Sequence, residues 1–381
     1  MGIHELYYHI SLFFSTKIFI NFSKKADKYI IMCYNMSEYK KRGAVMLDTT
    51  VFLNISPAIE VVLWVLLALV ASGIIFSAFF LPYVGKRVYF GTLVREGDDT
   101  WGYECSDPTN PEQLAMWEEG CRWADENASR MREVDITSFD GLRLHGEFYS
   151  FGSDECVIFL PGRCECLRYS CYFAKPYADM GINVLVIDTR CHGKSEGKYS
   201  TIGKNESRDV MDWAKYIHEN FGINKVWIHG ICVGSAGGFV CLSDENCPDY
   251  FAGMVTEGPY TTFKETFKQH LIDGKHPVFP VLQLVMGRIK RHAGVDWREV
   301  APIELAKRVD KHILYLFGER DIFSLPEKSR ELFRVTKSKT KKIVWFEKGS
   351  HSHLRINDPE KYDAAIKDYI RSVSRENIGV R

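Results

Sequence analysis

The most pronounced hydrophobic feature of the chain lies near its N-terminus, where residues 61–81 contain no charged side chain. At about 1.5 Å per residue, these roughly 21 residues would form a helix about 30 Å long, the thickness of the hydrocarbon core of a bilayer. Trp64 and Tyr83 lie near its two ends, where aromatic side chains are favoured at membrane interfaces. A buried core helix is the alternative, but this uncharged run is too long for one. The pattern therefore predicts one transmembrane helix, over residues 57–85.

The preceding segment, residues 1–56, fits no standard class. Residues 6–22 are apolar and aromatic but interrupted by Lys17, and several lysines follow. The segment resembles neither a signal peptide with a small-residue cleavage site nor a packed domain. One hypothesis is that translation begins at Met46, and a tryptic peptide from residues 29–40 detected in the native protein would exclude it.

After the apolar helix, residues 86–133 form a polar and aromatic connector in which residues 111–131 are expected to be helical. Beyond it, short β-branched or aromatic runs alternate with helical stretches, which is the signature of a mainly parallel sheet. The first two runs flank Phe139-Asp140-Gly141, a hairpin signal. The expected strands are 134–138, 142–149, 156–160, 183–188, 225–229, 253–257, 313–317 and 342–346, and the expected helices include 206–220 and 359–374. The pattern predicts an α/β domain over residues 134–381, with a mostly parallel eight-stranded sheet flanked by helices.

The composition narrows the classes of function. The chain has 46% hydrophobic and 26% charged residues, as in ordinary globular proteins, and Lys+Arg and Asp+Glu are balanced at 49 each. Without an excess of positive charge there is no electrostatic signature of nucleic-acid binding, and we exclude that class. The 11 cysteines are irregularly spaced, which favours free thiols in a reducing compartment. Cys164-Glu-Cys166 lacks the Cys-x-x-Cys spacing of metal sites, so no metal is expected.

The strongest chemical signal runs from Lys225 to Gly238 and reads as a strand, a sharp turn and a helix of small residues. Within it, Gly230-x-Cys232-x-Gly234 has the pattern of a nucleophile elbow with cysteine at its centre. Strained backbone pushes the central side chain out of the turn, and the flanking glycines let the strand and the helix pass closely. The helix N-terminus points its free N–H groups at the same place. We therefore expect Cys232 to be a nucleophile with a lowered pKa.

Four further segments occur in a recognisable order. They are Phe159-Leu-Pro-Gly-Arg-Cys164, Asp188-Thr-Arg-Cys-His-Gly-Lys-Ser-Glu-Gly197, Leu316-Phe-Gly-Glu-Arg-Asp321 and Lys348-Gly-Ser-His351. With the elbow, they resemble the oxyanion loop, a glycine-rich turn, the acid loop and the histidine segment of the α/β-hydrolase superfamily. The resemblance covers roughly residues 134–374 and is to the serine-aminopeptidase-like or acyl-esterase-like branch, with Cys191 where glycine is usual. It implies the α/β-hydrolase fold, preceded here by one transmembrane helix.

The order Cys232, Asp321, His351 is the nucleophile–acid–histidine order of that fold. By resemblance, Cys232 attacks a carbonyl carbon and His351 transfers the proton. Asp321 selects the tautomer of the imidazole and stabilises its charged form. The chemistry needs no cofactor.

The resemblance also implies an oxyanion hole. The N–H group of Val233 and that of either Arg163 or Cys164 are expected to hold the developing oxyanion. Losing one such donor typically costs about 3–4 kcal/mol of transition-state stabilisation.

Several residues compete for these roles. Ser235 is a weak alternative nucleophile, because it lies on the next helical turn and is expected to point into packing. His353 competes for the role of catalytic histidine, and Glu257, at the end of the sixth strand, for that of the acid. His192 and His229 are interpreted as structural groups satisfied by their neighbours.

Four cysteines, Cys164, Cys166, Cys191 and Cys232, are expected at the C-terminal edge of the sheet, where this architecture binds ligands. Coincidence in a cysteine-rich chain is the simpler interpretation. The alternative is oxidative regulation, in which Cys164 or Cys191 forms a disulfide with a sulfenate on Cys232. Mass spectrometry after mild peroxide tests it.

Residues 259–306, between the sixth and seventh strands, are rich in apolar and aromatic side chains and occupy the position of a lid. A small amphipathic lid over an acyl pocket is one interpretation. Ordinary helix packing with no role in substrate binding is the other.

The function predicted from these residues is that of a membrane-anchored α/β-hydrolase. It would cleave or transfer an acyl group from an ester, thioester or amide through a thioester on Cys232. The expected partners are a small-molecule or lipid-like acyl substrate and, through one helix, a membrane. The alternative is a non-catalytic relative that binds a lipid or a protein partner, although the retained acid and histidine argue against it. Oligomeric state and the identity of the acyl group stay open.

The orientation of the helix depends on where the chain begins. With the full leader, basic residues flank both ends of the helix and the positive-inside rule is undecided. If the chain starts at Met46, Asp48 and Glu60 precede the helix while Lys86 and Arg87 follow it, which favours a cytoplasmic C-terminal domain. The thiol content favours the same side.

Overall fold

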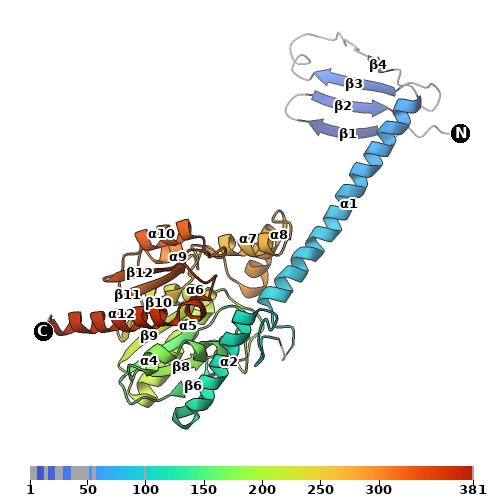
Figure 1. Cartoon of the computed structure of the whole chain (residues 1–381). Coiled ribbons are helices and arrows are strands. Elements are labelled where there is room, and N and C mark those ends of the chain that lie inside the picture. The colour runs from blue at the N-terminus through green and yellow to red at the C-terminus, as the bar shows by residue number, and fades with distance from the viewer. Residues whose placement is uncertain are drawn as a thin grey trace. The chain divides into compact units, whose positions relative to one another are not determined.

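The computed structural model describes residues 7–12, 16–21, 29–35, 51–53, 57–97 and 100–379 (Figure 1). The chain divides into two compact units, Met1–Phe80 and Leu81–Arg381. The first unit contains strands β1 (Tyr7–Leu12), β2 (Thr16–Asn21), β3 (Tyr29–Asn35) and β4 (Val51–Leu53), which pair antiparallel in that order. The leader, whose pattern did not indicate a packed domain, thus contains paired strands. Met46 lies outside the described residues, so the hypothesis of a later start stays a prediction.

Helix α1 (Pro57–Leu93) is 37 residues long and continues past residue 85, the predicted end of the transmembrane helix. Its part from Ala58 to Leu93 is long and apolar enough to cross a membrane, and large apolar side chains are exposed along it as far as Tyr83. The last turns differ, because Tyr89 and Leu93 are fully buried. The helix continues because these side chains pack within the second unit, and such packing stabilises a helix more than intrinsic propensity does.

The second unit is built on one eight-stranded sheet with the order β12-β11-β10-β9-β7-β8-β6-β5. Its strands are β5 (Met131–Thr137), β6 (Arg143–Tyr149), β7 (Glu155–Leu160), β8 (Asn183–Ile187), β9 (Lys225–Ile231), β10 (Phe251–Glu257), β11 (His312–Gly318) and β12 (Lys341–Phe346). Strand β6 pairs antiparallel with β5 and β8, and all other neighbours in this sheet are parallel. The predicted mostly parallel eight-stranded sheet is confirmed, with strand ends displaced by a few residues.

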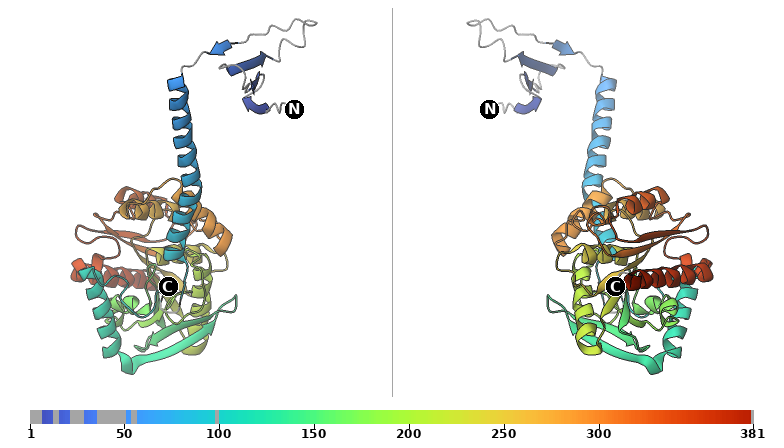
Figure 2. Two further views of the ribbon diagram at one scale, coloured as in Figure 1. Left: turned by 90° about the vertical axis from the view of Figure 1, so that its right-hand side faces the viewer. Right: turned by 90° about the vertical axis from the view of Figure 1, so that its left-hand side faces the viewer.

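Helices cover both faces of this sheet, with α2 and α12 on one side and α5 on the other (Figure 2). They are α2 (Pro111–Glu126), α3 (Leu167–Tyr172), α4 (Lys175–Ala178), α5 (Lys204–Phe221), α6 (Val233–Ser243), α7 (Phe263–Asp273), α8 (Val281–Arg288), α9 (Pro302–Leu305), α10 (Pro326–Val335), α11 (Leu354–Asn357) and α12 (Pro359–Gly379), with the short turns η1 (Ala128–Arg130) and η2 (Ile289–Ala293). Along β7, Val157 and Phe159 pack with α2 and α12, while Cys156 and Ile158 pack with α5. Because both faces are buried, the central strands are continuous apolar runs.

The segment predicted as a connector, residues 86–133, belongs to the same compact unit as the sheet. Helix α2 packs on α3 so closely that a Cβ atom at Gly120 would lie 2.2 Å from the carbonyl oxygen of Arg168. The compact unit that contains the sheet begins at Leu81. Its helix ends at Glu126, short of the expected residue 131, because the chain turns through η1 into β5.

Candidate active site

The turn between β9 and α6 places Cys232 in a strained backbone conformation, with φ 52° and ψ −110°. The N–H group of Cys232 donates to the carbonyl oxygen of Glu257 at 3.0 Å, which joins the turn to the end of β10. Both glycines of the motif are required sterically. A Cβ atom at Gly230 would lie 2.7 Å from Ser235 Cα, and one at Gly234 would lie 2.1 Å from the carbonyl oxygen of Leu160. The turn therefore has the geometry of a nucleophile elbow.

His351 and Asp321 meet on loops that follow β12 and β11, and Nδ1 of His351 lies 2.7 Å from Oδ2 of Asp321. The other carboxylate oxygen accepts the N–H groups of Phe323 at 2.8 Å and Ser324 at 2.7 Å, which hold it in place. Burial lowers the pKa of His351, but the charges of Asp321 and then Cys232 raise it well above its usual value. Nε2 of His351 is buried and has no hydrogen-bond partner among the described residues. That nitrogen is the one that a proton transfer from Cys232 requires.

The segment predicted to form the oxyanion hole lies at the end of β7. The N–H group of Cys164 donates to Nε2 of His192 at 3.2 Å. This N–H group already has an acceptor and does not offer a free donor to an oxyanion. The N–H group of Arg163 has no hydrogen bond among the described residues, and Val233 is the first residue of α6. The geometry therefore favours Arg163 over Cys164 as the partner of Val233.

The profile of the alpha/beta hydrolase fold family matches residues 155–333, from β7 to α10. The chain has the α/β-hydrolase fold. Its structure is similar to the Pyrococcus furiosus esterase Pf2001, with TM-score 0.56 and 20% identity over 65% of this chain and 93% of the esterase. It is also similar to DcsB in complex with its substrate analogue, with TM-score 0.52 and 18% identity over 64% of this chain and 98% of DcsB. At these identities the likeness concerns the fold alone.

Two relatives are similar in sequence. YqkD of Bacillus subtilis, an uncharacterized protein, is 24% identical over 202 residues, which are 52% of this chain and 65% of YqkD. Protein bem46 of Schizosaccharomyces pombe is 26% identical over 195 residues, which are 51% of this chain and 59% of bem46. The chain thus matches less than two thirds of the length of each relative.

The competing residues of this hydrolase fold have other partners. The Ser235 hydroxyl donates to the carbonyl oxygen of Gly230 at 2.8 Å and is fully buried, so it points into the packing. Nε2 of His353 lies 2.8 Å from Oε1 of Gln113, away from the acid loop. Glu257 accepts the N–H group of Leu354 at 3.2 Å and the hydroxyl of Tyr362 at 2.5 Å. Asp321 is the carboxylate that contacts the ring of His351.

Glu165 and Gln113 contact the loop after β7 that is predicted to form the oxyanion hole, and sequence reasoning missed both. Oε2 of Glu165 accepts the N–H group of Gly162 at 2.9 Å, and its Oε1 accepts Nε2–H of Gln113 at 3.1 Å. Burial raises the pKa of Glu165. No sequence signal could have joined them, because Gln113 comes from α2, in the segment that was predicted to be a connector.

The histidines expected to be structural are buried among polar groups. His229 lies between the hydroxyls of Tyr177, at 2.9 Å from Nδ1, and Tyr362, at 3.1 Å from Nε2. The ring of His192 stacks on Trp101 at a centroid distance of 4.7 Å. Burial lowers the pKa of His229 to about 3 and that of His192 to about 4, so both rings are neutral at physiological pH.

The thiols near the site differ in their surroundings. Cys191 is completely buried, whereas Cys164 and Cys232 are half-buried. Burial raises the pKa of Cys164, and Arg163 Nη1 lies 3.3 Å from its sulfur. A disulfide with an oxidised Cys232 stays a prediction. Within the described residues, no three His, Cys, Asp or Glu side chains are grouped to hold a metal ion.

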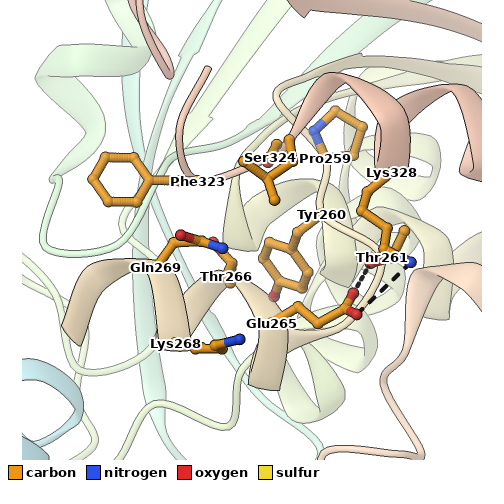
Figure 3. A pocket seen from close by; sticks show the side chains of 11 residues that line it. Pro259, Tyr260, Thr261, Glu265, Thr266, Lys268, Gln269, Phe323, Ser324 and Lys328 are labelled. Atoms are coloured by element: carbon orange, nitrogen blue, oxygen red, sulfur yellow. Dashed lines mark hydrogen bonds and ion pairs between the residues drawn. The ribbon is translucent and has the colours of Figure 1, made fainter. Parts of the chain in front are cut away.

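A pocket lies between the segment that follows β10 and the acid loop (Figure 3). It has a volume of about 190 Å³, room for roughly six water molecules at about 30 Å³ each. Its lining is formed by Pro259, Tyr260, Thr261, Glu265, Thr266, Lys268, Gln269, Phe323, Ser324, Leu325 and Lys328. The ring of Phe323 forms one wall and meets the ring of His351 edge-on at 5.4 Å. Residues of the predicted lid, 259–306, thus contribute much of the lining.

Proposed function

We propose that the chain is a membrane-anchored hydrolase that cleaves an acyl group from an ester, thioester or amide, with Cys232 as the nucleophile. The observation that carries the proposal is the strained elbow at Cys232 beside a His351–Asp321 pair, with the side chain of Cys232 near enough to raise the pKa of His351. A thiol is intrinsically a strong nucleophile once its proton has a base to accept it. A structural cysteine would require neither the strain nor the pair.

The proposed reaction proceeds in two halves. The thiol proton of Cys232 passes to Nε2 of His351 while sulfur attacks the carbonyl carbon of the substrate. The oxyanion of the tetrahedral intermediate accepts the N–H groups of Val233 and Arg163. Collapse breaks the bond to the alcohol, thiol or amine, which leaves with the proton from His351. Asp321 keeps Nδ1–H of the ring oriented and offsets its charge.

In the second half, water gives a proton to His351 and attacks the thioester, releasing the acid and the thiol of Cys232. An alcohol, amine or thiol in place of water would complete an acyl transfer instead, so hydrolysis and transfer share the same acyl-enzyme. The pocket beside Phe323 is the proposed binding site for the acyl or leaving group.

The membrane anchor in this proposal is the apolar part of α1. Its side chains are exposed from Ile59 to Tyr83, and the length suffices for one crossing. We propose a small-molecule or lipid-like acyl compound as the substrate and the cytoplasmic side of the membrane as the location of the domain.

The decisive experiment measures hydrolysis of p-nitrophenyl acyl esters by the full chain in nanodiscs. Wild type is compared with Cys232→Ala, Cys232→Ser, His351→Ala and, as a matched thiol control, Cys247→Ala. We expect turnover in wild type and Cys247→Ala, and none in Cys232→Ala or His351→Ala. Activity in Cys232→Ser alone would indicate a working site that prefers another acyl donor. No turnover and no labelling of Cys232 by an acyl-directed probe would favour a non-catalytic protein that binds a lipid or a protein partner.

A further inference from the structure

The surface of α1 changes from apolar to charged in the first turns of the second unit. Exposed apolar side chains along α1 end at Tyr83, and Lys86 and Arg87 are exposed one turn later. Charged side chains are costly inside the hydrocarbon core. If α1 is the anchor, as proposed above, the surface of the bilayer passes between Tyr83 and Lys86.

Helix α8 lies directly against this turn. Nη2 of Arg288 donates to the carbonyl oxygen of Pro82 at 3.0 Å, and a Cβ atom at Gly85 would lie 3.0 Å from the Cβ atom of Leu284. Pro82 and Gly85 belong to the second unit and lie in α1 beside the proposed bilayer surface. Because α8 contacts both residues, it lies within a turn of that surface.

The exposed surface next to α8 is basic and apolar. Between Asp273 and Asp296 the chain contains no acidic residue, but it does contain four basic ones, Lys275, Arg288, Lys290 and Arg291. Lys290 pairs with Asp296 at 3.3 Å, which leaves the other exposed cations, Lys275 and Arg291, unopposed by an ion pair among the described residues. Phe279, in the connection between α7 and α8, has 77% of its surface exposed, the largest fraction among the large apolar residues of the second unit. Exposed aromatic and basic side chains together are typical of surfaces that rest on anionic lipid.

We propose that the α7–α8 connection and η2, together with Lys86 and Arg87, form a lid face that rests on the anionic headgroups of the leaflet that α1 enters. Phe279 inserts below the headgroups, and Lys275 and Arg291 contact lipid phosphates or carboxylates. The inference rests on the proposed anchoring, but it is independent of whether Cys232 is a nucleophile.

The lid face borders the candidate active site. The buried sides of α7 and α8, through Phe263, Val281 and Val285, belong to the same apolar cluster as the end of α1, and Cys232 and Val233 pack against that cluster. The apolar cluster on the buried side of α7 and α8 thus extends to Cys232.

The test uses the full chain with a p-benzoylphenylalanine at position 279, reconstituted in nanodiscs of phosphatidylcholine with or without phosphatidylserine. After irradiation, lipid adducts are quantified by mass spectrometry. The matched control carries the probe at Phe139, also an exposed phenylalanine but in the β5–β6 hairpin. All chains carry Cys232→Ala, so the readout involves no catalysis.

We expect lipid adducts at position 279 and none above background at 139, with a higher yield in discs that contain phosphatidylserine. Lys275→Glu with Arg291→Glu should lower that yield at least about fivefold, the factor that corresponds to about 1 kcal/mol for one basic residue near an anionic surface. Lys215→Glu with Lys337→Glu, an equal charge change elsewhere on the surface, should leave it unchanged.

Equal yields at 279 and 139, adducts to another protein in place of lipid, or the same yield in both kinds of disc would each overturn the inference. Release of the chain from membranes by alkaline carbonate would overturn the anchoring and the lid face together. Absence of esterase activity in the wild type would overturn only the proposed chemistry.

Discussion

At the scale of single residues, the pair formed by His351 and Asp321 decides what the candidate site can do. Asp321 is buried and its two oxygens have separate tasks, since Oδ2 contacts the ring and Oδ1 accepts two backbone N–H groups. Because the charge of Asp321 is the first of the two that raise the pKa of His351, its removal should weaken both the orientation and the basicity of the ring.

Asp321→Asn should therefore lower kcat for acyl-ester hydrolysis by about 10³–10⁴-fold while the chain stays folded. The loss arises because the amide cannot stabilise the imidazolium. Steady-state kinetics in nanodiscs measures it, with Asp249→Asn, at an exposed aspartate, as the control. Retention of more than a tenth of the activity would argue that another carboxylate serves the histidine.

We expect Glu165 to position the proposed oxyanion loop through its contact with Gly162, and Glu165→Gln tests that role. The amide NH₂ would face either the N–H group of Gly162 or the NH₂ group of Gln113, both of which are donors. A buried donor without an acceptor costs about 1–3 kcal/mol. We expect kcat to fall about tenfold or more with little change in KM, whereas Glu219→Gln, on exposed α5 surface, should have no effect. A change in KM alone would contradict the assignment.

Glu257 makes the free energy of unfolding of the chain depend on pH. Burial raises its pKa from 4.5 to about 7. The folded chain thus holds this proton more tightly than the unfolded chain, and the stabilisation is complete below about pH 4.5 and lost as pH rises to about 7. By linkage, the wild type loses about 3 kcal/mol from this group above pH 7.

Glu257→Gln should abolish the loss of stability that the wild type shows as the pH rises to about 7. Relative to wild type, the variant should unfold several degrees higher at pH 8.5 and at nearly the same temperature at pH 4.5. Thermal unfolding in detergent measures both. A variant that is less stable at both pH values would show that the carboxylate, rather than the protonated acid, is the form that the fold holds.

At the scale of elements, the β9–turn–α6 unit depends on the absence of side chains where the strand and the helix cross. Gly230→Ala would place its Cβ atom 2.7 Å from the backbone of Ser235, and backbone cannot move without displacing Cys232. We expect a loss of several kcal/mol in stability and of all hydrolysis. Gly287→Ala in α8, where a Cβ atom meets nothing within 4 Å, should instead be neutral or stabilising by about 0.5–1 kcal/mol. Melting temperatures of the two variants decide the comparison.

At the scale of the whole molecule, the second unit includes the end of α1, so the apolar helix and the hydrolase fold share a structural element. Tyr89 and Leu93 contribute to the cluster under α7 and α8. If a loose connector followed the apolar helix, the domain would be complete without α1. Here the domain is not complete without α1, because Tyr89 and Leu93 form part of its core.

A chain beginning at residue 81 should accordingly fold as a soluble domain, whereas one beginning at residue 95 should aggregate. The shorter chain loses Tyr89 and Leu93 and exposes the apolar sides of α7 and α8, a surface of the kind that drives association. Size-exclusion chromatography and circular dichroism distinguish the two. A monomeric chain from residue 95 with an unchanged melting temperature would show that the end of α1 is dispensable.

The sequence by itself determined the elements that depend on local pattern. Alternating apolar runs and helices specified the eight-stranded sheet, because burial on both faces requires continuous apolar strands. The glycine spacing around Cys232 specified the elbow, since only glycine permits the crossing that the structure shows at Gly230 and Gly234. The uncharged run specified a helix of membrane length, although not its end at Leu93.

The tertiary structure alone decided which distant residues meet. It brought His351 into contact with Asp321, whereas His353 contacts Gln113. It also joined the N–H group of Cys164 to His192. It also brought Gln113 into contact with Glu165 and the end of α1 into one cluster with α7 and α8. None of these follows from periodicity, because each depends on contacts between segments far apart in the chain, and such contacts are set by packing.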